Sequence, residues 1–170
     1  MYIVTKRKTR LLILCIVILL IAGIAVSYFL PANVPLASLQ KGDAFQLRGF
    51  RYGLQKSAVK LLWTGPFEVE PLPGQDVLVS KDSAKVNGNP ADAYFYFQDG
   101  ELFQVVLTVK DCSDTWTQNL LEEARQLYGE EVSNANGNAY KWEGEDTLFC
   151  ISPTGRNQVM LILTQTDNSV

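Results

Sequence analysis

The chain has 170 residues, of which 47% are hydrophobic and 19% charged, and its formal net charge is −3. This length suffices for one modest hydrophobic core. The part of the chain after the first apolar run contains 18 acidic and 11 basic residues, which gives it a net charge of −7. Nucleic-acid and anionic-lipid surfaces attract a surplus of Lys and Arg, so this balance argues against binding to nucleic acid.

The first predicted element is a helix over the uncharged apolar run from Leu11 to Leu30. A helix of about 20 apolar residues matches the hydrocarbon thickness of a bilayer. A cleaved signal peptide is the alternative, but the stretch SYFLPANVPLAS lacks small residues at the expected cleavage positions. We therefore predict a transmembrane signal-anchor, with a cytoplasmic tail at 1–10 and the C-terminal domain outside the cytoplasm. The residues that set this topology are Lys6, Arg7, Lys8 and Arg10.

Residues 31–47 contain two prolines and little hydrophobic periodicity, so we expect a linker before an exported domain at 48–170. The first helix of that domain is predicted to carry its apolar face on Leu54, Ala58, Leu61 and Leu62. It ends at Gly65 and Pro66, because glycine suits a helix cap and proline prevents continuation.

A second helix is predicted after the N-cap residues Ser113 and Asp114, with its end at Gly129. Three strands are expected after each helix, at 76–80, 93–97 and 102–109, then at 139–143, from Thr147 and from Gln158. A polar loop is expected at 81–92. Two helix-plus-three-strand repeats, at about 50–110 and 111–166, predict an α+β fold, a two-layer domain with two helices on one face of an antiparallel sheet.

The turn at Asp99 and Gly100 allows two pairings of its flanking strands. A two-residue turn mixes apolar and polar side chains on each face. A three-residue loop with Gly100 in a bulge collects the apolar ones on one face: Phe95, Phe97, Phe103, Val105, Leu107 and Val109. The other face then carries Tyr94, Tyr96, Gln104 and Thr108. The loop separates the two kinds better, so we predict the bulged hairpin.

Ser57 and Lys60 form an S-x-x-K pattern, which in penicillin-binding proteins and class A β-lactamases places a serine nucleophile beside its lysine. The S-D-N and K-T-G motifs that complete such a site do not occur. A solvated helix face explains both residues better. The chain also has no histidine, the commonest general base and a frequent zinc ligand. We predict no catalytic, cofactor or metal site.

Acidic residues offer an alternative function. A small ligand sensor or hydrolase would line a pocket with carboxylates such as those of Glu143 and Glu145. A solvated turn is the simpler explanation for this acidic stretch. Cys112 and Cys150 are expected to remain free thiols, because Cys150 alternates with the core candidates Phe149 and Ile151 and faces away from the helices.

Three short motifs resemble the BamE-like (SmpA/OmlA) envelope domains: Tyr52-Gly53, the stretch from Val59 to Pro66, and Phe97-Gln-Asp-Gly-Glu-Leu102. The doubling is similar to the tandem arrangement of β-lactamase-inhibitor proteins. Together the resemblance covers about Phe50 to Thr166. It implies a non-enzymatic module of the bacterial cell envelope, whose partners are an envelope or membrane protein and, through the transmembrane helix, the lipid bilayer.

Overall fold

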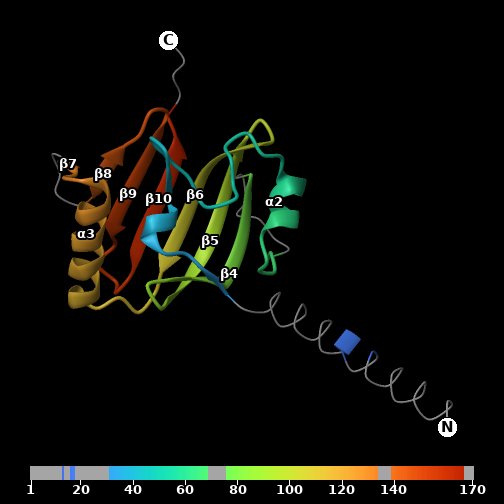
Figure 1. Ribbon diagram of the computed structural model, residues 1–170, viewed down its shortest axis with the longest axis horizontal. Helices are drawn as coiled ribbons and strands as arrows, with labels where there is room; N and C mark the ends of the chain where they lie inside the picture. The colour runs from blue at the N-terminus through green and yellow to red at the C-terminus, as the bar shows by residue number, and fades with distance from the viewer. Residues whose placement is uncertain (1–12, 14–15, 18–30, 69–75, 134–138, 167–170) are drawn as a thin grey trace, which may run out of the picture. The chain divides into compact units, whose positions relative to one another are not determined.

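The structure is a computed structural model that describes residues 13, 16–17, 31–68, 76–133 and 139–166. The chain forms two compact units, Met1–Leu30 and Pro31–Val170. The described residues of the first unit, Ile13, Ile16 and Val17, have helical backbone. All of the sheet and both of the helices discussed below belong to the second unit (Figure 1).

The predicted transmembrane helix is overturned by the structure. No helix among the described residues is both long and apolar enough to cross a membrane. Helices α2 (Lys56–Leu62) and α3 (Asp114–Tyr128) have seven and fifteen residues, whereas a span needs about 20 apolar ones. The predicted signal-anchor and single-pass membrane location are corrected on this ground. Most of the predicted span lies outside the described residues, as do Leu11, Leu30, Lys6, Arg7, Lys8 and Arg10.

One mixed sheet of eight strands forms the centre of the second unit, in the order β1-β4-β5-β6-β10-β9-β8-β7. The strands are β1 (Ala32–Asn33), β4 (Val77–Val86), β5 (Asn89–Gln98), β6 (Glu101–Val109), β7 (Val132–Ser133), β8 (Tyr140–Glu143), β9 (Thr147–Pro153) and β10 (Val159–Gln165). Strand β1 runs parallel to β4, and the other neighbours are antiparallel. The prediction of an antiparallel sheet is therefore wrong, because the N-terminal segment contributes a parallel edge strand.

The two halves of the domain meet in the middle of the sheet. Each half runs from a helix into antiparallel strands, β4-β5-β6 after α2 and β8-β9-β10 after α3. The last strand of each half pairs with the other, from Val159 opposite Val109 to Thr164 opposite Gln104. The halves thus share one sheet and one core instead of forming separate domains.

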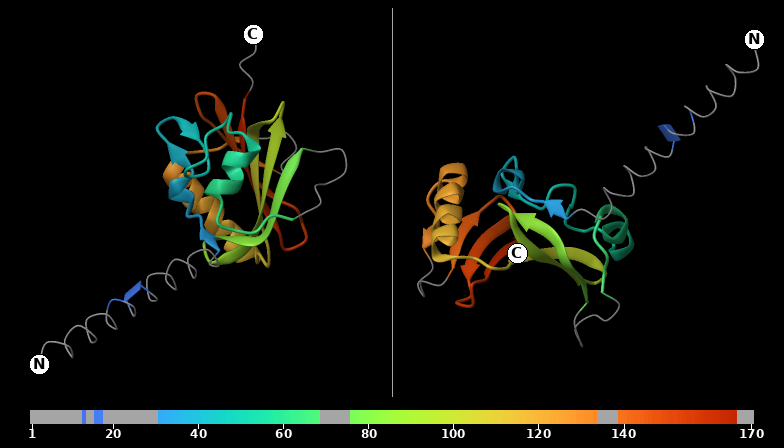
Figure 2. Two further views of the ribbon diagram at one scale, coloured as in Figure 1. Left: turned by 90° about the vertical axis from the view of Figure 1, so that its right-hand side faces the viewer. Right: turned by 90° about the horizontal axis from the view of Figure 1, so that it is seen from below.

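Both helices pack on the same face of the sheet (Figure 2). From α2, Trp63 at the C-terminal end lies against Phe95 of β5, with ring centroids 5.1 Å apart. From α3, Tyr128 lies edge-on to Phe149 of β9 at 5.7 Å. The predicted apolar face of α2 is wrong at Leu61 and Leu62, which are 86% and 49% exposed, whereas Leu54 packs against the core and Val59 is fully buried. Trp63 packs against the aromatic side chains of the sheet, so the side of α2 that carries Val59 and Trp63 is the one that faces the core.

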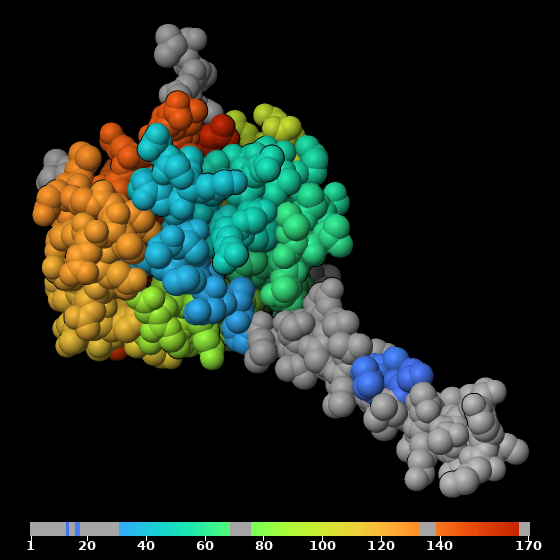
Figure 3. Space-filling model, viewed as in Figure 1, coloured from blue at the N-terminus to red at the C-terminus, as the bar shows by residue number. Residues whose placement is uncertain are grey.

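The segment at 31–50, which we call the strap, crosses the same face between the two helices (Figure 3). It contains β1, a 3₁₀ turn η1 (Leu36–Ser38), and a short ribbon of β2 (Gln40–Lys41) and β3 (Ala44–Phe45). Its apolar side chains are buried in the core: Val34, Leu36, Leu39, Phe45, Leu47 and Phe50. Residues 31–47 are therefore part of the folded domain, where a linker was expected.

Two hairpins of the first half are tighter than predicted. Strands β4 and β5 continue through the expected polar loop to a turn at Asn87-Gly88, with positive φ at both residues, as two-residue hairpins require. The turn at Asp99-Gly100 is also two-residue, with Gln98 opposite Glu101. The predicted three-residue loop is wrong. The break in the pairing of β5 and β6 falls between Tyr96 and Phe97 instead of at Gly100. The bulge still leaves Phe95, Phe97 and Val105 on the buried face.

Candidate functional site

The motif residues considered for catalysis lie on solvent-exposed surfaces. Ser57 and Lys60 are exposed on α2. Glu143 and Glu145 are exposed at the turn between β8 and β9. No group of three or more Cys, Asp or Glu side chains suited to a metal ion occurs within the described ranges. The structure therefore does not assemble these residues into a reactive centre.

The sheet also has a face opposite the helices, which we call the open face (Figure 2). Strand register aligns its side chains in rows across the sheet. One row runs across β4, β5, β6, β10, β9 and β8 through Val79, Tyr94, Val106, Ile162, Cys150 and Lys141. The neighbouring row runs through Val77, Tyr96, Gln104, Thr164, Leu148 and Glu143.

The open face has an uncharged centre. From β4 to β9 neither row contains a charged side chain, and charge enters only at β8 with Lys141 and Glu143. Within the rows, Val77, Val79, Val106 and Cys150 are buried, whereas Tyr94, Tyr96 and Ile162 are half-buried and reach the surface. Such a centre, rich in aromatic and aliphatic side chains and poor in charge, is typical of the core of a protein–protein interface.

The two tyrosines are partly desolvated by their neighbours on the sheet. Burial raises the pKa of Tyr94, and the nearby carboxylate of Asp92 raises it further. Burial also raises the pKa of Tyr96. Both side chains are therefore neutral phenols that offer an aromatic surface and a hydroxyl, the combination that makes tyrosine common at interfaces.

A charged network lies at one end of the open face. The Lys110 ammonium is 2.8 Å from the Asp92 carboxylate and 2.9 Å from that of Asp82. The same Asp92 oxygen accepts a 2.8 Å hydrogen bond from the backbone N–H of Asp82. The bonds to Asp92 and Asp82 raise the pKa of Lys110. The network holds the irregular stretch of β4 between Ser80 and Ala84 against β5.

Part of this surface was predictable from sequence. Alternation in β5 and β6 placed Tyr94, Tyr96, Gln104 and Thr108 on one face, and alternation in β9 directed Cys150 away from the helices, both as found. Cys112 and Cys150 are free, buried thiols, and burial raises the pKa of both. β10 also contributes Met160, Ile162 and Thr164 to this face, which the sequence analysis does not predict.

Comparison with known proteins adds no relative: no family model, curated protein or solved structure matches this chain.

Proposed function

We propose that this protein is a non-enzymatic interaction module that binds a partner protein through the open face of its sheet. The observation that carries the proposal is the uncharged centre of that face in a chain of which 19% is charged. The resemblance to BamE-like domains favours the same function. The alternative, a sensor or hydrolase with acidic residues, has less support, because Glu143 and Glu145 are exposed at a turn.

The face favours a folded protein surface with an apolar, uncharged centre. Tyr94 and Tyr96 of β5 supply large, stiff contact surfaces within the uncharged part of the rows, and such residues dominate the energy of protein interfaces. The ionic groups of Lys110, Asp92 and Lys141 lie at the periphery, where charge affects orientation and rate of association more than affinity.

A site-specific photo-crosslink tests the proposal in the full chain. A photoreactive phenylalanine analogue replaces Tyr96 in one variant and Ser57 in the control, since Ser57 is exposed on α2, across the sheet. We expect a discrete adduct from position 96 that is absent from position 57. An adduct with twice the mass of the chain would instead show self-association and overturn the proposal.

The captured protein is then purified, and its affinity is measured for the unmodified chain and for Tyr96→Ser and Ser57→Ala variants. We expect the Tyr96→Ser variant to bind at least about tenfold more weakly, as is usual for the loss of an aromatic side chain that anchors an interface. Equal affinities for the two variants would contradict a role of the open face. Unchanged circular dichroism of the Tyr96→Ser variant shows that the loss is not due to unfolding.

A further inference from the structure

Charge is unevenly distributed along the domain. Residues 31–64 contain five basic residues and one acidic residue, a net charge of +4. Residues 65–170 contain six basic and 17 acidic residues, a net charge of −11. The strap and α2, both in the basic part, pack on the face of the sheet opposite the open face (Figure 2). A local positive region therefore lies on an otherwise acidic domain.

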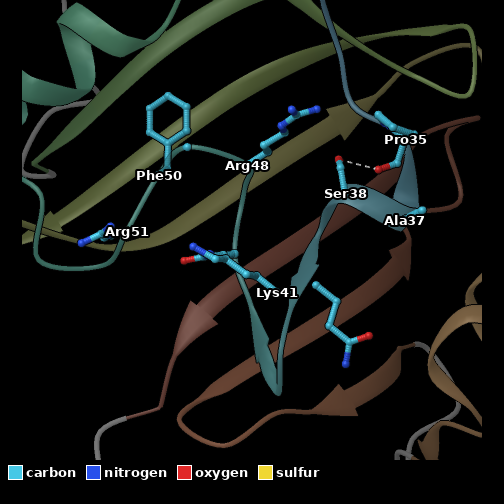
Figure 4. A pocket seen from close by; sticks show the side chains of 10 residues that line it. Pro35, Ala37, Ser38, Lys41, Arg48, Phe50 and Arg51 are labelled. Atoms are coloured by element: carbon cyan, nitrogen blue, oxygen red, sulfur yellow. Dashed lines mark hydrogen bonds between the residues drawn. The ribbon is translucent and has the colours of Figure 1, made fainter.

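A cavity of about 630 Å³ lies within this positive region, between the β2–β3 ribbon and the turn at 48–51. Three cationic side chains line it: Lys41, Arg48 and Arg51. Figure 4 shows Arg48 and Arg51 on either side of Phe50, with Lys41 reaching the same cavity from the ribbon. The amides of Gln40 and Gln46 and the hydroxyl of Ser38 complete its polar lining.

No acidic residue lines the cavity within the described part of the chain. Among the described residues, the ion pairs involve Lys56, Lys81, Lys110 and Arg125, and none involves the three cations of the cavity. Asp43, the one acidic residue of 31–64, lies in the turn of the ribbon and does not line it. Three positive side chains thus line one cavity, and no acidic side chain of the described residues forms an ion pair with them.

The walls of the cavity are fixed to the core. Phe50 is 6% exposed, and its ring lies 5.3 Å from that of Phe95 and 5.9 Å from that of Trp63. The Tyr52 hydroxyl donates a 2.9 Å hydrogen bond to the carbonyl of Phe45, which ties the turn to the ribbon. The backbone that carries the cations is therefore held in place before a ligand arrives, which lowers the entropic cost of binding.

A second cavity of about 190 Å³ adjoins the first and shares Pro35, Ser38, Arg48 and Phe50 with it. Its remaining lining includes the apolar side chains of Val34, Leu47, Leu62 and Trp63. A ligand with its charge at the first cavity therefore has an apolar recess beside it.

We propose that the basic cavity binds a small organic anion with two or more negative charges, a phosphate ester or a polycarboxylate. Its volume lies within the roughly 300–1,000 Å³ of typical small-molecule sites. Two guanidinium groups favour phosphate and carboxylate oxygens, which they bind through paired N–H donors. A nucleic acid is disfavoured, because a long polyanion would also face the net charge of −11 on the rest of the domain. This site is on the other side of the sheet from the open face and does not depend on the proposed interaction there.

Isothermal titration of the full chain with two probes, pyrophosphate and citrate, tests this proposal at an ionic strength held constant with potassium chloride. We expect saturable binding of at least one probe with one site per chain. Binding of pyrophosphate alone identifies the phosphate class, binding of citrate alone identifies the polycarboxylate class, and binding of both shows recognition by charge. Failure of both probes to bind would overturn the proposal.

Variants locate the binding. Arg48→Gln and Arg51→Gln are each expected to weaken binding at least about tenfold, the usual effect of losing a charge-assisted contact. Lys85→Gln removes an exposed cation that does not line the cavity and is expected to leave affinity within about twofold. If Lys85→Gln and Arg48→Gln lowered the affinity equally, the binding would be due to general electrostatic attraction, and the proposed site would be refuted. Because Arg48 and Arg51 are exposed, their replacement is expected to leave the melting temperature unchanged. Lys41→Gln provides a third variant, with the same expected loss of affinity.

Discussion

The backbone N–H of Phe45 donates a 2.8 Å hydrogen bond to the hydroxyl of Thr147, 102 residues further along the chain. Both residues are buried, so water does not replace this bond if it is broken. The contact attaches the β2–β3 ribbon of the strap to the start of β9. It therefore links the segment that carries the basic cavity to the second half of the sheet.

Replacing Thr147 by valine preserves shape but leaves the Phe45 N–H without an acceptor. We expect a loss of about 1–3 kcal/mol in the free energy of unfolding, the penalty for a buried unpaired donor. Thr147→Ser keeps the hydroxyl and serves as the control, with a smaller loss from the missing methyl group. Urea unfolding followed by tryptophan fluorescence measures both. Equal stabilities of the two variants would show that the hydrogen bond contributes little.

Gly144 has no room for a side chain beside the same contact. A Cβ atom at this position would lie 2.4 Å from the carbonyl oxygen of Asp43 and 2.5 Å from the Thr147 hydroxyl. We expect Gly144→Ala to displace the ribbon and destabilise the domain by about 1–3 kcal/mol, as overpacking does. Glu145→Ala, at an exposed neighbouring position, is the control and is expected to unfold at the same temperature as the unmodified chain. The measurement is the thermal midpoint by circular dichroism.

The Asp92 side chain is 8% exposed and pairs with Lys110, whereas that of Asp82 is 68% exposed. Asp92→Asn removes a charge from the buried side of the network, and we expect it to cost about 1.5–3 kcal/mol of stability. Asp82→Asn suits the positive φ of 49° at this position and changes stability by less than about 1 kcal/mol, as exposed ion pairs do. Chemical unfolding of both variants decides the order. A larger effect at Asp82 would contradict this assignment.

Arg125 holds Glu131 through two hydrogen bonds, of 2.9 Å and 2.7 Å, just beyond the end of α3. These bonds lower the pKa of the Glu131 carboxyl below its usual value of 4.5. A lowered folded-state pKa means that the stabilisation is complete above the unfolded-state value and is lost as pH falls through the folded-state pKa. We expect the unfolding free energy of the unmodified chain to drop more steeply below about pH 4.5 than that of Glu131→Gln. Parallel pH profiles of the two proteins would refute the assignment.

Local sequence signals correctly predicted both ends of α3. The hydroxyl of Ser113 accepts a 3.1 Å hydrogen bond from the backbone N–H of Trp116 at the start of α3, and the helix ends before Gly129, which has a φ of 83°. Both features follow from cap chemistry within a few residues. On α3, Leu120, Leu121 and Ala124 are buried, whereas Leu127 is 42% exposed.

The features that sequence did not reveal depend on distant partners. Val59 and Trp63 are buried because they meet an aromatic cluster on the sheet, which the periodicity of a seven-residue helix does not encode. The short elements and two prolines of the strap predict a linker, yet its apolar residues are buried in the core between the helices. The basic cavity depends on distant contacts in the same way, because Lys41, Arg48 and Arg51 line one cavity only after the strap packs on the sheet.

The long separation between Phe45 and Thr147 also has a consequence for biosynthesis. At about 5–20 residues per second, a ribosome adds the 102 residues between them in roughly 5–20 s. During that interval the strap emerges before the strand that accepts it, with Leu36, Leu39 and Phe45 still exposed. The nascent chain therefore presents an apolar segment to chaperones for seconds, and the strap can complete this contact only after β9 has been synthesised.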